Sequence, residues 1–281
     1  MLKKLMAFIL FFAILVFIIP RSPLKGLLDE GERRFAQALL NHFGSEYFHG
    51  PARLKAVHLD KRLRLTVEGF EADFKIPKGS FPLEIASLRS ENSLIGLLLK
   101  RPVLFDVKSI RFNRSQHEGV QGQALMQTGE AWRFAFNATI DGVGLEDIAP
   151  LSPETLSGSN GKMTGILNFK YDEANGPDFK LDAHGLEPGG NVPARFFDSL
   201  LPYLPHAATR QKIKQLEAFF PVVGYRRADL KMNLAEADKI KAFLHIYVPD
   251  YNLDLNLNLE IRIDEKNAFG KIAELMELLS K

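Results

Sequence analysis

The chain has 281 residues, of which 36 are basic and 34 acidic, and it contains no cysteine. The near-balance of charge gives no sign of a nucleic-acid-binding surface, and the lack of cysteine excludes disulfides, thiol catalysis and cysteine metal sites. A chain of this length forms one large domain or two small ones, and its strand-rich pattern favours one.

The chain begins with an apolar segment flanked by basic residues. Lys3 and Lys4 precede residues 5–19, which are uncharged and almost wholly apolar, and Arg21 follows closely. Such a segment is an export signal or a membrane anchor, slightly shorter than the about 20 residues of an ideal span. Because no small-residue cleavage pattern follows it, we predict that residues 1–22 form an uncleaved transmembrane helix with a cytoplasmic N-terminus.

Beyond the anchor the hydrophobic period changes from helical to alternating. Apolar residues recur at helical spacing up to Gly44, so residues 23–49 are predicted to form an amphipathic helix and a linker. From residue 50 to residue 265 the period is mostly two, which predicts strands separated by Gly- and Asn-rich turns. Strands are expected at residues 63–67, 72–76, 83–88, 103–107, 109–112, 121–127, 132–140, 163–171, 179–183, 228–234, 242–248 and 251–263.

Helical patterns interrupt and follow this β-region. A short apolar stretch at residues 94–99 separates two strands. Residues 194–220 predict a helical insertion that is interrupted at Pro202 and Pro205. Residues 266–281 carry apolar residues at helical spacing and predict a C-terminal amphipathic helix.

The longest strand pattern lies near the C-terminus. From Tyr251 to Ile263 the odd positions are apolar and the even positions polar or charged, so one side of the strand is apolar over about 40 Å. A typical strand is about half as long. An apolar face of this length needs a covering layer or an apolar guest, so the sequence predicts an apolar surface rather than a reaction centre.

No segment carries a specific catalytic or metal-binding motif. Gly158–Lys162 superficially resembles a phosphate loop, but its glycines are too close together and Met163 replaces the Ser or Thr that would hold magnesium, so we interpret it as a turn. The seven histidines lack metal-ligand spacing, and His245 is interpreted as a packed or surface residue. We therefore predict no catalytic residues, no metal and no cofactor.

The aromatic stripe of Trp132, Phe134 and Phe136 has two interpretations, core packing or part of a lipid-facing wall. Strand after strand repeats the same one-sided pattern, while few helices are predicted to cover those faces. Either the sheets cover each other, or the apolar surface is left available.

Two segments resemble the recurring unit of the AsmA-like envelope proteins. Residues 141–151, Asp-Gly-Val-Gly-Leu-Glu-Asp-Ile-Ala-Pro-Leu, resemble their L-x-D-L-A-x-L segment, and residues 156–169 resemble the G-x-x-x-G strand pair that follows it. The single N-terminal anchor, the β-meanders and the terminal strand and helix are similar to those of the YdbH-type dicarboxylate-transport-domain proteins. The likeness covers most of residues 50–265.

The resemblance implies a mainly β protein whose long, twisted antiparallel sheet forms an open, taco-like groove with an apolar lining. The resemblance also implies that the protein belongs to the repeating β-groove bridge proteins, which carry phospholipid between membranes. The implied location is the inner membrane, with a single pass and the bulk of the chain in the periplasm. This chain is much shorter than the bridge-forming members, so alone it is too short to cross a periplasm.

The leading hypothesis is a non-enzymatic protein that binds acyl chains. The expected partners are phospholipid or another acyl lipid, the inner membrane and an envelope protein, but no nucleic acid. A closed β-sandwich that docks an envelope partner through strand edges or a terminal helix is the alternative, and an anchored hydrolase with a polar cleft is the third. The predicted groove-lining residues are Trp132, Phe134, Phe136, Leu167, Phe169, Leu253, Leu255, Leu257 and Leu259.

Overall fold

The computed structural model describes residues 33, 34, 36–38, 48–76, 79–115, 119–128, 133–172, 175–204, 206–236 and 239–262. The predicted anchor at 1–22, most of the predicted helix at 23–49, Trp132 and the predicted helix at 266–281 lie outside these residues. Within the described ranges, no helix has the length and apolar character needed to cross a membrane.

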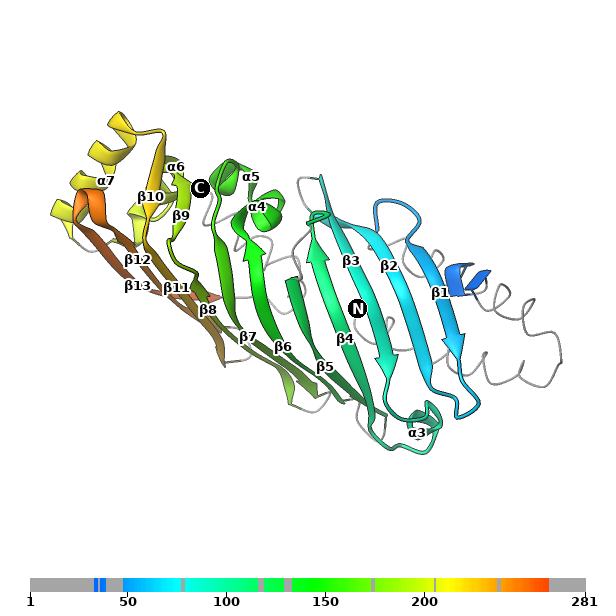
Figure 1. Cartoon of the computed structure of the whole chain (residues 1–281). Coiled ribbons are helices and arrows are strands. Elements are labelled where there is room, and N and C mark those ends of the chain that lie inside the picture. Colours follow the sequence, from blue (N-terminus) through cyan, green and yellow to red (C-terminus); the bar gives the residue numbers. More distant parts are fainter. Residues whose placement is uncertain are drawn as a thin grey trace.

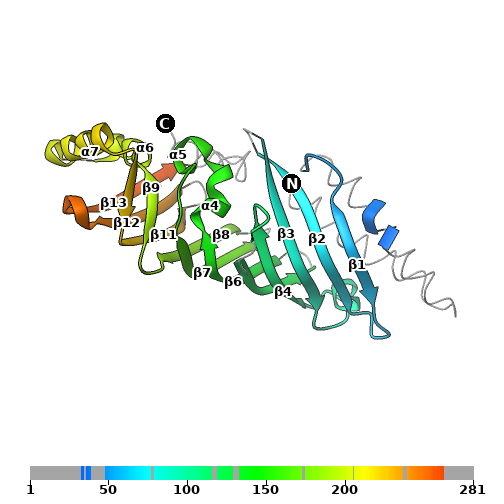
Figure 2. The same cartoon turned by 45° about the horizontal axis from the view of Figure 1, so that its top comes forward.

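The protein is mainly β and is built on one antiparallel sheet of eleven strands (Figure 1). The order in the sheet follows the chain from β1 to β8 and then passes directly to β11, β12 and β13. The first and last strands do not pair with each other, so the sheet is not closed. Figure 2 shows that it twists along its length, so that strands at its two ends run in different directions. The strands are β1 (Arg53–Leu59), β2 (Leu65–Ile76), β3 (Gly79–Ser90), β4 (Val103–Phe112), β5 (Gly119–Gln127), β6 (Arg133–Gly144), β7 (Lys162–Asp172), β8 (Gly176–Gly185), β11 (Arg227–Glu236), β12 (Lys239–Val248) and β13 (Leu253–Arg262).

Apolar side chains from all eleven strands share one side of the sheet, which we call the apolar face. In β13, the leucines from Leu253 to Leu259 are buried and the polar residues between them are exposed, as the alternation predicts. The apolar face continues from strand to strand, because residues that pair on neighbouring strands point to the same side of the sheet. Leu255 lies opposite Ile246 and Leu167 opposite Leu181. With ten strand spacings of about 4.8 Å, the apolar face extends about 48 Å across the strands.

In the four neighbouring strands β1 to β4, the alternation of the two sides is interrupted at the same level of the sheet. Their apolar residues step by three positions there, yet they join one packed cluster; the pairs are Leu54 and Val57, Val67 and Phe70, Ile85 and Leu88, and Val107 and Ile110. In β2 the step contains Gly69 with φ +60°, a left-handed conformation that glycine adopts without strain. In β4 it contains Ser109 with φ 52°. This step explains why the sequence pattern divides β2 and β4 into two strands each, although both are continuous.

The sequence pattern does not predict three of the strands, which are short or irregular. β1 contains one of these three-residue steps, so its alternation is broken after Leu54. β9 (Gly190–Pro193) and β10 (Val222–Tyr225) have four residues each and pair with each other in a separate two-stranded sheet. Strands of that length give no measurable period.

The described helices lie at the two ends and along one rim of the apolar face. α3 (Ile95–Leu98) and its preceding residue bury Leu94 and Leu97 among apolar residues of β1 to β5. α4 (Leu145–Ile148), η1 (Ala149–Leu151) and α5 (Pro153–Leu156) follow β6 and lie beside the ends of β6 and β7 (Figure 1). Where the helical insertion is predicted, the chain forms α6 (Ala194–Asp198), η2 (Leu201–Tyr203) and α7 (Ala207–Phe219), and these pack on β12 and β13.

Candidate functional site

Eight of the nine predicted lipid-binding residues lie on the apolar face, and the ninth, Trp132, lies outside the described residues. The eight fall into two environments that the sequence pattern does not distinguish. One group lies on β13 beneath the helical insertion, and the other lies on β6 and β7 near the middle of the sheet.

The leucines of β13 are covered by the chain itself. Leu253, Leu255 and Leu257 keep only 3%, 2% and 2% of their surface exposed. They form one cluster with residues of the insertion, among them Phe197 and Ile213. Leu259, at 7%, is also buried. The insertion and β13 therefore make a packed two-layer unit, and Leu253, Leu255 and Leu257 are part of its core.

The middle of the apolar face is less covered. Phe134, Phe136, Leu167 and Phe169 are all half-buried. Phe136 lies opposite Phe169 in the β6–β7 register, and the ring of Phe134 lies 6.0 Å from that of Phe169. The registers add four more half-buried apolar residues from the next two strands. We call the whole set the central section, which consists of Phe134, Phe136, Leu167, Phe169, Phe179, Leu181, Leu230 and Met232.

The central section is a surface suited to an apolar ligand. Its side chains come from four neighbouring strands, β6, β7, β8 and β11, and none of them carries a charge. The sequence predicts the four members on β6 and β7 but not those on β8 and β11, because β8 and β11 meet only across an insertion of about 40 residues. A strand pattern contains no information about which strand will be its neighbour.

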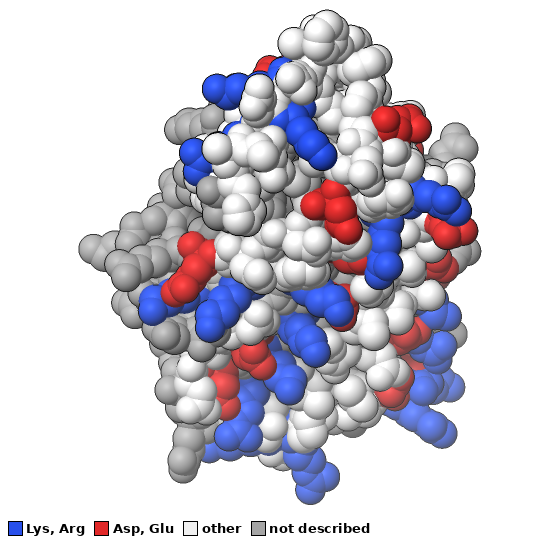
Figure 3. All heavy atoms as spheres, turned by 90° about the vertical axis from the view of Figure 1, so that its left-hand side faces the viewer, with Lys and Arg blue, Asp and Glu red and all other residues white. Residues whose placement is uncertain are grey.

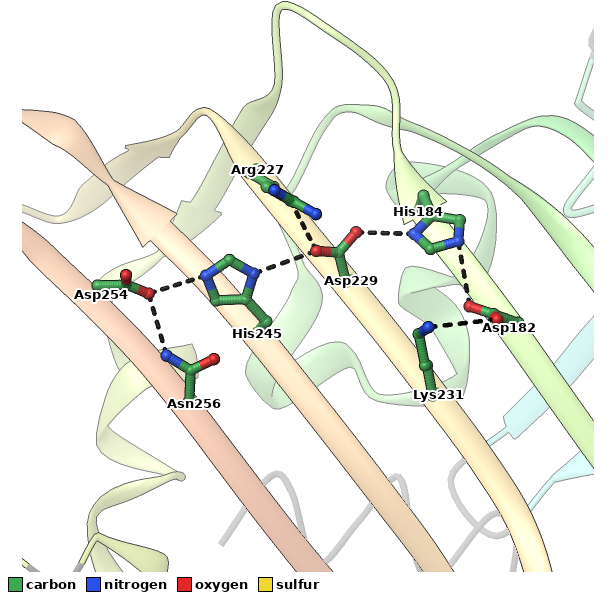
Figure 4. A network of polar contacts seen from close by, with 8 residues as sticks. All are labelled: Asp182, His184, Arg227, Asp229, Lys231, His245, Asp254 and Asn256. Carbon is green, nitrogen blue, oxygen red and sulfur yellow. Dashed lines mark hydrogen bonds and ion pairs between the residues drawn. The ribbon is translucent and has the colours of Figure 1, made fainter.

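The opposite side of the same strands carries a chain of charged residues, which we call the polar ladder (Figure 4). At its centre is Asp229 of β11, whose Oδ1 lies 2.7 Å from Nδ1 of His184 on β8 and whose Oδ2 lies 3.1 Å from Nδ1 of His245 on β12. Arg227 donates from Nε to Oδ2 of Asp229 at 2.7 Å. Nε2 of His245 lies 2.8 Å from Oδ1 of Asp254 on β13. The ladder therefore joins four strands side by side.

The outer members of the polar ladder are more loosely held. Nε2 of His184 lies 3.1 Å from Oδ1 of Asp182, but that oxygen has no partner in hydrogen-bonding geometry. Lys231 lies 3.5 Å from the other oxygen of Asp182. Asn256 donates to Oδ1 of Asp254 at 3.3 Å.

Asp229 is the most strongly perturbed acid of the ladder. Burial alone would raise the pKa of its carboxyl, but hydrogen bonds from His184, His245 and Arg227 outweigh that effect and lower its pKa to about 2. Both ring nitrogens of His245 face carboxylate oxygens, so this imidazole is occupied in structural contacts rather than offered to a substrate. No group of residues in the described ranges has the composition and geometry to hold a metal ion. We interpret the ladder as a device that holds β8 against β11, β12 and β13.

The segment that resembles the AsmA-like unit forms a corner at one end of β6 and β7. Buried Asp147 accepts a hydrogen bond from the backbone N–H of Gly144 at 2.9 Å, and Leu145 donates to the carbonyl of Gly161 at 2.8 Å. Gly161 has φ +127°, a conformation that residues with a side chain rarely adopt, and a β-carbon there would lie 2.3 Å from Oη of Tyr225, so this position favours glycine. Desolvation, followed by the charge of Glu146, raises the pKa of Tyr225.

The segment 158–162 begins as the loop between α5 and β7 and enters β7 at Lys162. Within it, Asn160 forms a β-bridge with Asn191 of β9, so the backbone of Asn160 is hydrogen-bonded within the fold. This geometry agrees with a turn.

Comparisons of the chain with protein-family models, curated proteins and solved structures give no match. The apolar face and the polar ladder behind it are therefore the two features of the described residues that bear on function.

Proposed function

We propose that this is a membrane-anchored, non-enzymatic, extracytoplasmic protein that binds lipid acyl chains against its apolar face, which lines a groove. The observation that carries the proposal is the continuity of that face over eleven strands, with a half-buried central section. The role we assign to it is phospholipid transport or maintenance of the outer envelope, with the N-terminal segment holding the chain in the inner membrane and the β-region in the periplasm. This location follows the resemblance to AsmA-like proteins.

The energetics favour an acyl chain over a polar ligand. Transfer of each CH₂ group from water to an apolar surface contributes about 0.8 kcal/mol, so a few methylene groups on the central section already give measurable binding. Such binding needs no polar recognition group, because the hydrophobic effect is not directional. The charged residues that β8 and β11 contribute to the polar ladder point to the other side of the sheet.

Site-specific photocrosslinking tests the proposal. A photoreactive phenylalanine analogue in place of Phe169 is expected to form an adduct with phospholipid when the full chain is irradiated in membranes, and the same analogue at Leu181 should behave alike. The matched control is Ile166, which lies on the same strand as Phe169, is also apolar and is 53% exposed, but points to the opposite side of the sheet. Mass spectrometry of the purified protein reads out the adducts.

The position of the adduct decides the outcome. Adducts at Phe169 and Leu181 without an adduct at Ile166 support binding on the apolar face. Equal adducts at all three positions would mean non-specific contact with membrane lipid, and no adduct at any of them would contradict the proposal.

A stability measurement belongs with this test. Since Phe169 is only half-buried, its replacement by glutamine should lower the melting temperature by only a few degrees while removing the lipid adduct at Leu181. A large loss of stability without any lipid adduct would instead favour a closed core.

A structural or assembly factor is the second candidate function. It is favoured by the burial of Leu253, Leu255 and Leu257 beneath the insertion, because the chain covers part of its apolar face itself. In that case the edges of the sheet would dock an envelope protein. Absence of lipid from every position of the central section, together with co-purification of one protein partner, would support this candidate.

A further inference from the structure

The end of the molecule that carries the insertion ends in an exposed apolar loop. Four consecutive residues, Phe219, Phe220, Pro221 and Val222, are all exposed, and the exposed fractions of the first, second and fourth are 74%, 41% and 49%. We call this segment the apolar tip. It lies where α7 ends and β10 begins, at the top of the molecule in Figure 1.

The apolar tip is firmly attached to the sheet. On the inner side of α7, Ile213 and Leu216 are buried in the same cluster as the leucines of β13. The ring of Phe220 lies 5.0 Å from that of Tyr251, which belongs to η3 (Pro249–Tyr251) between β12 and β13. The exposure of Phe219 and Val222 is therefore a property of a packed unit and not of a chain end.

Basic residues outnumber acidic ones in the segment that carries α7, the apolar tip and β10. Between Tyr203 and Arg226 the chain has four basic residues (Arg210, Lys212, Lys214 and Arg226) and one acidic residue (Glu217), a net charge of +3. Lys212 and Lys214 are exposed, and Lys212 lies seven residues, or about two turns, before Phe219 on the same side of the helix. Figure 3 shows this end of the molecule with mostly uncharged side chains at its top, and with Lys and Arg side chains together with some Asp and Glu side chains below them.

We infer that the apolar tip is a membrane-docking site that inserts Phe219 and Val222 into the interface of a lipid bilayer with anionic headgroups. Exposed aromatic and aliphatic residues at a helix end suit the boundary between headgroups and acyl chains. Basic side chains beside them suit the negative surface potential of such a bilayer, which makes an anionic membrane a better match than a neutral one. The inference concerns a surface separate from the central section and does not depend on lipid binding there.

The apolar tip lies near the edge of the sheet that is opposite to the edge at which the chain enters it. β13 and β1 are the two edges of the sheet, about 48 Å apart across the strands, and the chain enters the sheet at β1. The predicted anchor precedes β1, whereas the tip packs on β12 and β13. The tip and the edge at which the chain enters the sheet therefore lie at opposite ends of the sheet, so that docking at the tip uses a part of the protein far from β1.

The test uses the full chain in nanodiscs of neutral lipid and an environment-sensitive fluorophore on a single cysteine. The chain contains no native cysteine, so Ala218→Cys, next to the tip and exposed, gives one labelling site. Addition of vesicles with about one third anionic phosphatidylglycerol is expected to raise the emission several-fold, and neutral phosphatidylcholine vesicles should bind at least tenfold more weakly. A label at Asn175→Cys, in the turn between β7 and β8, should not respond.

Substitutions in the tip complete the test. Phe219→Ser with Val222→Ser should weaken vesicle binding at least tenfold, and Lys212→Gln with Lys214→Gln should weaken it several-fold; all four side chains are exposed, and circular dichroism checks that the fold is kept. No response from the label beside the tip, equal binding to neutral vesicles, or an equal response from the label in the β7–β8 turn would overturn the inference. A rise in emission that depends on protein concentration without vesicles would also overturn it, in favour of contact with a second copy of the chain.

Discussion

Leu255→Asp is expected to destabilise the protein by about 4 kcal/mol or more, which is a large part of the stability of a typical domain. Leu255 is 2% exposed and lies in the cluster between β13 and the insertion. The substitution removes a well-packed side chain and places an unpaired carboxylate among apolar residues, and each of these changes alone costs several kcal/mol. Chemical denaturation followed by circular dichroism, with the full chain in mild detergent, measures the change.

The matched control for this prediction is Asn258→Asp. Asn258 lies on the same strand with the opposite parity and is exposed, so its replacement should change the unfolding free energy by less than about 0.5 kcal/mol. Asn256 is a poorer control, because its amide lies 3.3 Å from Asp254 and a new carboxylate there would meet an existing one. Similar losses from Leu255→Asp and Asn258→Asp would contradict the register of β13.

Asp229→Asn is expected to cost about 2 kcal/mol at neutral pH, and the cost should disappear in acid. The pKa of Asp229 falls from its ordinary value of 3.8 to about 2 in the folded protein. A lowered pKa means that the charged carboxylate stabilises the folded state above about pH 4, and that this stabilisation is lost as the pH falls from about 4 to about 2. The difference in unfolding free energy between the native chain and the variant should therefore shrink as the pH falls below about 4.

A second carboxylate, outside the polar ladder, serves as the control that separates the effect of the ladder from the effect of removing any one carboxylate. Asp178 lies on β8 on the same side of the sheet but is exposed, so Asp178→Asn should have a small effect at every pH. A pH-independent cost of Asp229→Asn would mean that side-chain packing and not charge explains it. Direct measurement of the Asp229 carboxyl titration by NMR would give the same answer by another route.

Much of the fold could be predicted because strand periodicity is local. The odd-position alternation of β13 describes which of its residues are buried, and it holds along the strand from Leu253 to Glu260. The pattern fails where the backbone departs from a regular pleat, as at Gly69 and Ser109, whose left-handed φ values exchange the two sides of the strand. A one-residue irregularity moves every later side chain to the other side of the strand. The alternation before the irregularity therefore does not predict which residues are buried after it.

The environment of the site residues depends on contacts that the sequence does not encode locally. Leu255 and Phe169 both lie on the apolar side of an alternating strand, yet one is covered by residues of the insertion and the other is half-buried. The polar ladder escaped prediction for the same reason. Asp229 is 45 residues from His184 and 16 from His245 along the chain, and only the pairing of β8 with β11 brings the two histidines to one carboxylate. Nothing in the spacing of these residues reveals that pairing.

The order of the strands makes the length of this protein adjustable. Seven neighbour pairs from β1 to β8 and two from β11 to β13 are consecutive in the chain, and β8 with β11 is the one exception in the described sheet. Each hairpin therefore touches little beyond its immediate neighbours, as the repeats of a solenoid do. One more hairpin inserted at the turn between β7 and β8 would add two spacings, about 10 Å, to the sheet without changing any register elsewhere. A family built on this plan could match its span to the distance between two surfaces by duplicating hairpins, while its folding, which relies on contacts between sequence neighbours, would remain unaffected.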